Sequence, residues 1–223
     1  MDMTELSHKQ LKNYQRAHRD TWNQGLSLRV HRALSWLDRA EQERAREDLD
    51  AEFLFLWISF NAAYASEYTH DQRLQQRDAF ARFFTRIVDY DETQQLYQVI
   101  WQHYPTKIRT LMDNPYVFQP FWDCASGRNP ADSWQDTFAS AKRAAHQALA
   151  ESNVVTSLSI IMDRLYTLRN QLVHGGATWN GGLNREQLRD ACGILAALLP
   201  ITLQLMMQHG NEVWADAAYF ITD

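Results

Sequence analysis

Apolar residues recur at helical spacing along most of the chain. The clearest stripe lies in residues 153–174, where steps of four, three, four, three and four separate its members: Val154, Leu158, Ile161, Leu165, Leu168 and Leu172. This spacing places side chains on one face of an α-helix. The pattern therefore predicts a buried helix over residues 153–174.

Similar stripes predict helices over residues 22–47, 48–68, 72–89 and 133–151, with another beginning after Asp91, a candidate N-cap. A last long helix is expected to begin after Asn184, with Gln187 placed as in a capping box. The predicted inward positions of the first two helices are Leu26, Val30, Ala33, Leu34, Leu37, Phe53, Leu56, Trp57, Phe60 and Tyr64. We expect an all-α, up-down helical bundle that forms one domain over residues 1–223, with its core in about 20–210.

Residues 114–132 interrupt the helical pattern. Three prolines and Gly127 break the periodicity, and Phe118, Phe121 and Trp122 lie between them. Proline and glycine favour a loop, whereas the aromatic residues need an apolar surface to pack on. We therefore expect an ordered loop insertion that packs on the helices.

Composition narrows the class of protein. Hydrophobic residues make up 45% of the chain, enough for a core, and the few glycines and prolines disfavour a β-sandwich. The net charge of −5 argues against a protein that coats nucleic acid nonspecifically, but it leaves room for a local basic site. The two cysteines, Cys124 and Cys192, form neither a metal-ligand pattern nor a disulfide framework. We expect a cytoplasmic protein without a bound metal.

No membrane segment is expected. Residues 1–20 are polar and lack the apolar region of a secretory signal. Residues 191–207 are apolar, but they are shorter than a typical span and contain Gly193 and Pro200. We interpret them as a buried core or dimer-interface helix.

Candidate chemistry lies where the stripe of residues 153–174 ends. Asn170 and His174 are four residues apart and share a helix face, and the long side chain of Arg169 can reach the same surface. Gly175 and Gly176 are suited to end the helix in a left-handed cap. A guanidinium, an amide and an imidazole that titrates near neutrality suit phosphate chemistry. A structural alternative stays open, in which the imidazole and the amide only satisfy the helix end.

Arg169-Asn170-Gln171-Leu172-Val173-His174 resembles the Arg-x4-His motif of the HEPN superfamily (higher eukaryotes and prokaryotes nucleotide-binding). The segment from Trp57 to Tyr64 is similar to the first core helix of bacterial HEPN proteins. The resemblance covers about residues 20–210 and implies a homodimer in which two motifs face each other across one cleft. It implies RNA cleavage without a metal or other cofactor, to 2′,3′-cyclic phosphate and 5′-hydroxyl ends. Roles in antiphage defence or in a toxin–antitoxin stress response also follow by resemblance.

The resemblance assigns roles to particular residues. Arg169 would bind the scissile phosphate, His174 would act as general base or acid, and Asn170 would position the phosphate. Arg164 and Arg185 would add positive charge to the cleft. Among the aromatic residues of the earlier segment, Asn61 needs partners and could orient His174 or hold the motif helix, whereas Tyr64 is expected in the core with its hydroxyl at the edge.

The sequence departs from one branch of the HEPN superfamily, and other functions remain open. The toxin-type HEPN motif has Tyr two residues after its His, and here that position is Gly176, so control by an antitoxin that modifies this tyrosine is not implied. The alternative function is a non-catalytic HEPN module that binds nucleotide or RNA, or only dimerises; a helical adaptor with an accidental motif is a third interpretation. The glycine-rich loop of residues 175–183 could approach a phosphate, but an ordinary helix connection is favoured.

Overall fold

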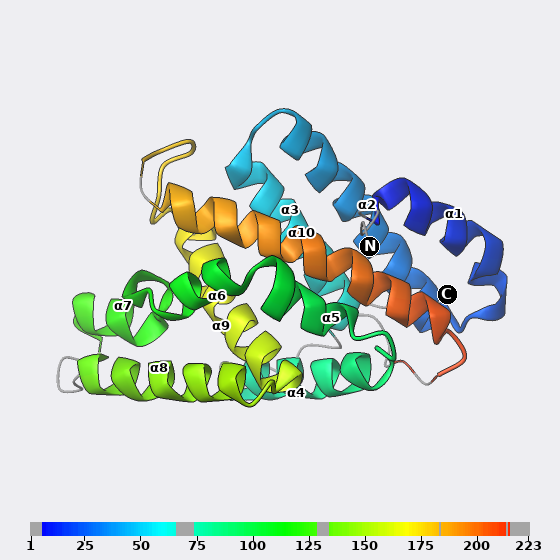
Figure 1. Ribbon diagram of the computed structural model, residues 1–223. Helices are drawn as coiled ribbons and strands as arrows, with labels where there is room; N and C mark the ends of the chain where they lie inside the picture. Colours follow the sequence, from blue (N-terminus) through cyan, green and yellow to red (C-terminus); the bar gives the residue numbers. More distant parts are fainter. Residues whose placement is uncertain (1–5, 66–73, 129–133, 183, 213, 215–223) are drawn as a thin grey trace.

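The computed structural model describes residues 6–65, 74–128, 134–182, 184–212 and 214, and these are α-helical nearly throughout, with no β-strand among them (Figure 1). The all-α bundle predicted from the sequence is confirmed. The elements in chain order are α1 (His8–His18), η1 (Arg19–Thr21), α2 (Gln24–Ala45), α3 (Leu49–Tyr64), α4 (Leu74–Asp89), α5 (Gln95–Gln98), the π-helical η2 (Val99–His103), α6 (Pro105–Met112), η3 (Pro115–Val117), α7 (Gln119–Ala125), α8 (Trp134–Ala150), α9 (Val154–Val173) and α10 (Arg185–Gln208).

Helices α2 and α3 form a hairpin that packs on α10 (Figure 1). Asn23 caps α2 through the backbone N–H of Leu26, and Asp48 caps α3 through that of Ala51. The predicted inward faces of α2 and α3 are confirmed. Tyr64 is half-buried, and each of the other predicted residues is at most 3% exposed: Leu26, Val30, Ala33, Leu34, Leu37, Phe53, Leu56, Trp57 and Phe60. Residues 66–68, also predicted to be helical, lie outside the described residues.

Helix α9 lies between this hairpin and the helices α4, α6 and α8 (Figure 1). It begins after Asn153, whose side chain accepts from the backbone N–H of Thr156, and it ends at Val173, as the stripe predicts. Four stripe residues are at most 1% exposed: Leu158, Ile161, Leu165 and Leu168. The stripe therefore anchors α9 in the core.

Helix α10 is the core helix expected over residues 191–207. By length and composition this helix could span a membrane, but 72% of its most apolar 18-residue segment is buried inside the fold. Pro200 lies inside it, beside Thr202, whose hydroxyl donates to the carbonyl of Leu198. Burial against α2, α3 and α1 accounts for its apolar sequence.

The insertion of residues 114–132 is ordered in its described part, as expected, but describing it as a loop was wrong. It contains η3 and the two-turn helix α7, each with a proline in its first turn. Proline is tolerated there because the first amide of a helix has no intrahelical partner. Residues 129–132 lie outside the described residues.

Two capping predictions had different outcomes. The carboxylate of Asp91 accepts from the backbone amides of Gln95 and Leu96 at 2.9 and 2.8 Å and so caps the start of α5, but the N-cap residue is Gln94 and not Asp91 as predicted. Asn184 is the residue before α10, but the predicted capping box is absent, since its side chain makes no cap hydrogen bond. Its backbone has a φ of 59°, and its amide donates instead to Gln171 Oε1 at 2.6 Å.

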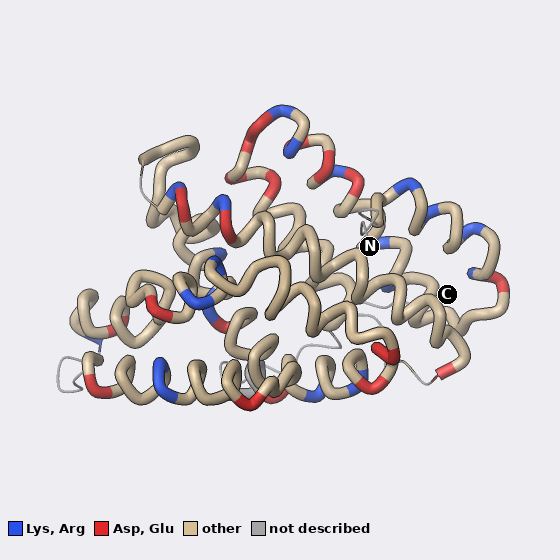
Figure 2. The backbone as a smooth tube through the Cα atoms, viewed as in Figure 1, with Lys and Arg blue, Asp and Glu red and all other residues tan. Residues whose placement is uncertain are grey.

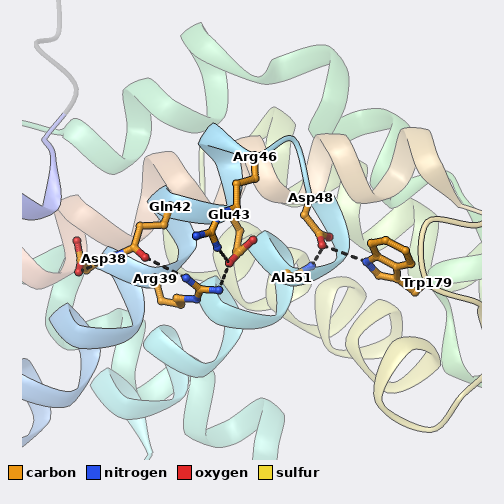
Figure 3. Close-up of polar contacts among 8 residues, drawn as sticks. All are labelled: Asp38, Arg39, Gln42, Glu43, Arg46, Asp48, Ala51 and Trp179. Atoms are coloured by element: carbon orange, nitrogen blue, oxygen red, sulfur yellow. Dashed lines mark hydrogen bonds and ion pairs between the residues drawn. The ribbon is translucent and has the colours of Figure 1, made fainter.

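Charged residues are unevenly distributed over the surface. Acidic residues gather where α2 turns into α3, and basic residues follow one another along α1 (Figure 2). At the α2–α3 turn the carboxylate of Glu43, 5% exposed, is paired with Arg39 and, at 2.7 Å, with Arg46 (Figure 3). These acids therefore contribute to the structure of the hairpin.

Candidate functional site

The motif residues lie together in the last turn of α9. Arg169 and Asn170 are half-buried, and His174 is the exposed C-cap residue. The backbone N–H of His174 donates to the carbonyl of Asn170 at 3.0 Å, which keeps the two residues one helical turn apart. The buried stripe thus delivers three polar side chains to the surface at one helix end.

Gly175 and Gly176 end α9 in the left-handed cap that the sequence predicts. Gly175 has a φ of 73°, and its N–H donates to the carbonyl of Leu172 at 3.3 Å. The N–H of Gly176 donates to the carbonyl of Gln171 at 2.7 Å. These two bonds are the pair of the Schellman motif, so the cap fixes the backbone on which His174 stands.

The guanidinium of Arg169 has a neutral partner. Its Nη1 donates to Asn170 Oδ1 at 3.0 Å, and no carboxylate of the described residues forms an ion pair with it. Arg169 therefore keeps a full positive charge that a phosphate could use. Asn170 holds that charge in place and retains its own N–H donors.

Within the described part of the chain, the side chain of His174 makes none of the contacts expected of a histidine that stabilises the fold. Its ring makes no hydrogen bond or ion pair with any described residue, and it is exposed. Its backbone, rather than its imidazole, closes the helix. The ring nitrogens are consequently available to a ligand.

Gln171 connects the motif to two distant segments. Its Nε2 donates to the carbonyl of Tyr116 in η3 at 2.6 Å, and its Oε1 accepts from Asn184 at 2.6 Å. The same Tyr116 carbonyl accepts from Trp122 Nε1 at 2.8 Å. The insertion and the start of α10 therefore border the motif.

Exposed apolar side chains gather around this helix end. In the segments that the structure describes, the large hydrophobic residues exposed to solvent are Trp36, Tyr116, Val173 and Trp179. Val173 belongs to the motif, Trp179 to the loop after it, and Tyr116 to the bordering insertion. Trp179 is 74% exposed and Val173 48%. Three of the four therefore lie in the motif or in segments next to it, where a partner could bury them.

The loop after the motif is fastened to the first turn of α3. Trp179 Nε1 donates to Asp48 Oδ2 at 3.1 Å (Figure 3), and the backbone N–H of Asn180 donates to Asp50 Oδ2 at 3.1 Å. The backbone N–H of Asn180, which could have bound a phosphate, therefore already donates to a carboxylate. The geometry favours the interpretation of this loop as a structural connection.

Arg185 is committed to the same carboxylate. Its Nη1 lies 2.5 Å from Asp50 Oδ2, and its Nη2 donates to Asn180 Oδ1 at 3.1 Å. Its charge is neutralised by Asp50, so the geometry gives it a bracing role rather than the phosphate contact suggested by the sequence.

Arg164 lies in the interior. It is 2% exposed, and its guanidinium carbon is 4.5 Å from the centre of the Phe118 ring and 5.6 Å from that of Phe138. A cation over an aromatic face is attracted by the ring electrons. Arg164 thus anchors the insertion and α8 to α9, and its burial leaves it no surface on which to meet RNA.

Asn61 and Tyr64 lie away from His174. Helix α3 contacts α9 through Trp57 and Tyr166, and Tyr166 is two turns before His174. Asn61 and Tyr64 come after Trp57 in α3, in the part of that helix that leads to α4. The ring of Tyr64 packs on Phe60 and Phe80, with centroids 4.7 and 5.0 Å apart. No hydrogen bond between described residues joins Asn61 to His174. The structure brings together Arg169, Asn170 and His174, but not these two.

The described residues offer no metal centre: no three His, Cys, Asp or Glu side chains come together there in a ligating arrangement. Burial raises the pKa of Cys192, and its thiol contacts the carbonyl of Leu49.

Sequence reasoning missed Gln171 and Asp50, which hold the surroundings of the motif. Gln171 lies inside the motif, so its position gave a signal. Nothing local marks Asp50, because its partners Asn180 and Arg185 are 130 and 135 residues away.

No family model matches the chain, and no curated protein or solved structure is similar enough to it to indicate a relationship.

Proposed function

We propose that this protein is a HEPN-type endoribonuclease that cleaves RNA at a composite site formed by Arg169, Asn170 and His174 of two chains. The observation that carries the proposal is the state of two side chains at one surface. Arg169 has no acidic partner among the described residues, and the ring of the neighbouring His174 is exposed and unbonded. Arg169 and His174 are therefore both available to bind a ligand.

The chemistry follows from these positions. Arg169 binds the scissile phosphate and stabilises the extra negative charge of the transition state. Asn170 orients Arg169 through their hydrogen bond. His174 removes the proton of the ribose 2′-hydroxyl or protonates the leaving 5′-oxygen, which yields a 2′,3′-cyclic phosphate and a 5′-hydroxyl. One histidine from each chain would supply the base and the acid.

The exposed apolar residues support the dimer. Val173 adjoins His174, and Trp179 follows it in the loop, so a two-fold contact that buries them would bring two motifs together. A symmetric interface uses the same patch on both subunits, which places both copies of Arg169 in one groove.

The test compares His174→Ala and Arg169→Ala with His103→Ala, an exposed histidine on η2. Loss of proton transfer should slow cleavage of single-stranded RNA by ~10²–10⁴-fold in the His174 variant, with RNA affinity nearly unchanged. The Arg169 variant should lose both rate and affinity, because arginine contacts phosphate in the ground state and more strongly in the transition state. The His103 variant should cleave normally.

Cleavage should persist in EDTA. If RNA is bound but never cut, the non-catalytic binding module is the correct function. If the His174 variant cuts bound RNA at the wild-type rate, His174 is a ligand contact and the mechanism is wrong.

A further inference from the structure

Helix α1 and the turn after it carry a row of basic residues. Lys9, Lys12, Arg16 and Arg19 follow one another at steps of three, four and three. On a helix these steps keep side chains within about 80° of each other. Figure 2 shows basic positions along α1, whereas acidic and basic positions lie together at the α2–α3 turn.

The side of α1 that faces the protein lies about 100° around the helix from this row. Leu11 and Gln15 are each 2% exposed, and α1 packs on α2 and α10. Lys9, Arg16 and Arg19 are exposed, and Lys12 is half-buried. The basic row therefore points into solvent from a helix that is held firmly in place.

We name these four residues the basic face, and His31 and Arg32 of α2 lie beside it. Burial and the charges of Lys12, Arg19 and Arg32 lower the pKa of His31, and burial, Arg16 and Arg19 lower that of Lys12. After burial, the cause of both lowered pKa values is the repulsion between neighbouring positive charges.

Negative charge lies at the start of the row, where Asp38 Oδ1 is 3.1 Å from His8 Nδ1 and Glu41 Oε1 accepts the backbone N–H of His8, and it is sparse farther along. In the described segments neither Lys12 nor Arg16 forms an ion pair, and the acid nearest to Arg19 is Asp20 at 3.7 Å, whose side chain is 93% exposed. In a chain with a net charge of −5, such a local excess of positive charge creates an attractive field for a polyanion.

We propose that the basic face binds the phosphate backbone of RNA at a position remote from the cleavage motif. This inference rests on the proposed ribonuclease function in one respect, the choice of RNA as the polyanion. A membrane surface fits less well, because helices that lie on membranes turn large apolar residues outward. The apolar residues of α1 face inward, and the exposed large hydrophobic residues of the described chain lie on other elements.

The motif lies at one end of α10, and the Arg19 end of the basic face lies near the other. At its C-terminal end, the Trp22 side chain packs against Gly210, and Asn23 Nδ2 donates to the carbonyl of Glu212 at 3.4 Å. At its N-terminal end, Asn184 binds Gln171 of the motif. A helix of 24 residues is about 36 Å long, so a stacked strand rising about 3.4 Å per nucleotide needs roughly ten nucleotides to contact both sites of one chain. Long RNA should depend on the basic face, and very short RNA should not.

The experiment measures binding of a fluorescein-labelled single-stranded RNA of about 30 nucleotides over a range of salt concentrations. The variant is Lys9→Glu/Arg16→Glu, which changes two exposed residues, and the matched control is Arg82→Glu/Arg143→Glu, two exposed residues on α4 and α8. His174→Ala in every protein prevents cleavage during the measurement. The control applies the same change in net charge away from the basic face.

Each lost phosphate contact should reduce the slope of log affinity against log salt by about 0.7, so the Lys9/Arg16 variant should lose about 1.4. Its affinity at low salt should fall at least about tenfold, whereas the control should change about twofold or less. With His174 restored, cleavage of an RNA of about four nucleotides should be unchanged, because the basic face is out of its reach.

An unchanged slope, or an equal loss in the control, would overturn the proposal. Binding to phosphatidylserine vesicles but not to RNA would overturn it in favour of a membrane surface. If the wild-type protein never cleaves RNA but the slope still falls in the variant, this inference stands and the proposed ribonuclease function fails.

Discussion

Arg185 and Asp50 form an ion pair of 2.5 Å between the first residue of α10 and the first turn of α3. The same carboxylate accepts the backbone N–H of Asn180, so one acid fastens both the loop and the helix that follow the motif. Asp50 is 6% exposed, and little solvent is available to replace either contact. Its position determines where the motif's loop lies.

Replacing Asp50 by Asn should reduce the free energy of unfolding by about 1–3 kcal/mol, since it removes the negative charge that pairs with Arg185 in a nearly buried place. Urea unfolding monitored by circular dichroism provides the measurement. Asp48→Asn is the matched control: Asn caps a helix about as well as Asp, and the bond from Trp179 that its single oxygen cannot also accept involves a largely exposed indole, so its effect should be small. Equal effects in both variants would contradict the role assigned to Asp50.

Gly175→Ala should destabilise the protein by about 1–2 kcal/mol, because a Cβ is disfavoured at a φ of 73°. An added methyl group would meet no atom within 4 Å there, so backbone strain alone would cause the loss. Gly182→Ala is the control, since that site is equally open and its φ is not in the left-handed region. Thermal unfolding of the two variants should separate them; equal melting temperatures would show that the cap is unimportant.

The protein should be a dimer in solution at micromolar concentration, and Val173→Glu should make it a monomer by placing a charge in the apolar contact. Light scattering measures the mass directly. Trp36→Glu changes another exposed hydrophobic residue, on α2 and away from the motif, and should leave the dimer intact. A wild-type monomer at micromolar concentration would rule out the composite site.

The two cysteines should differ in reactivity. Cys192 is 3% exposed and its pKa is raised by burial, so both access and the thiolate fraction are low, whereas Cys124 is half-buried. In the native protein a disulfide reagent such as DTNB should modify Cys124 first and reach Cys192 only on unfolding. The Cys124→Ser variant identifies the fast thiol; rapid reaction of both would mean that α10 does not pack on α3 as described.

The periodic pattern of apolar residues was sufficient to predict most long helices, because burial of one face is a local property of the sequence. The stripe from Val154 to Leu172 predicted α9 to within a residue at each end, and the two glycines after His174 predicted its cap. Local signals also existed where the prediction failed: the Gln10 side chain accepts from the N–H of Ser7 at the start of α1, an unpredicted helix, at 2.9 Å.

The sequence alone therefore determined the helical class, the core faces and the gathering of Arg169, Asn170 and His174, since all three lie within two turns of one helix. Only the tertiary structure decided which charges are available. Arg164 and Arg185 resemble Arg169 in sequence, but packing encloses the first under Phe118 and pairs the second with Asp50. Whether an arginine is buried, paired or open depends on residues far away in the chain, and the local pattern carries no record of them.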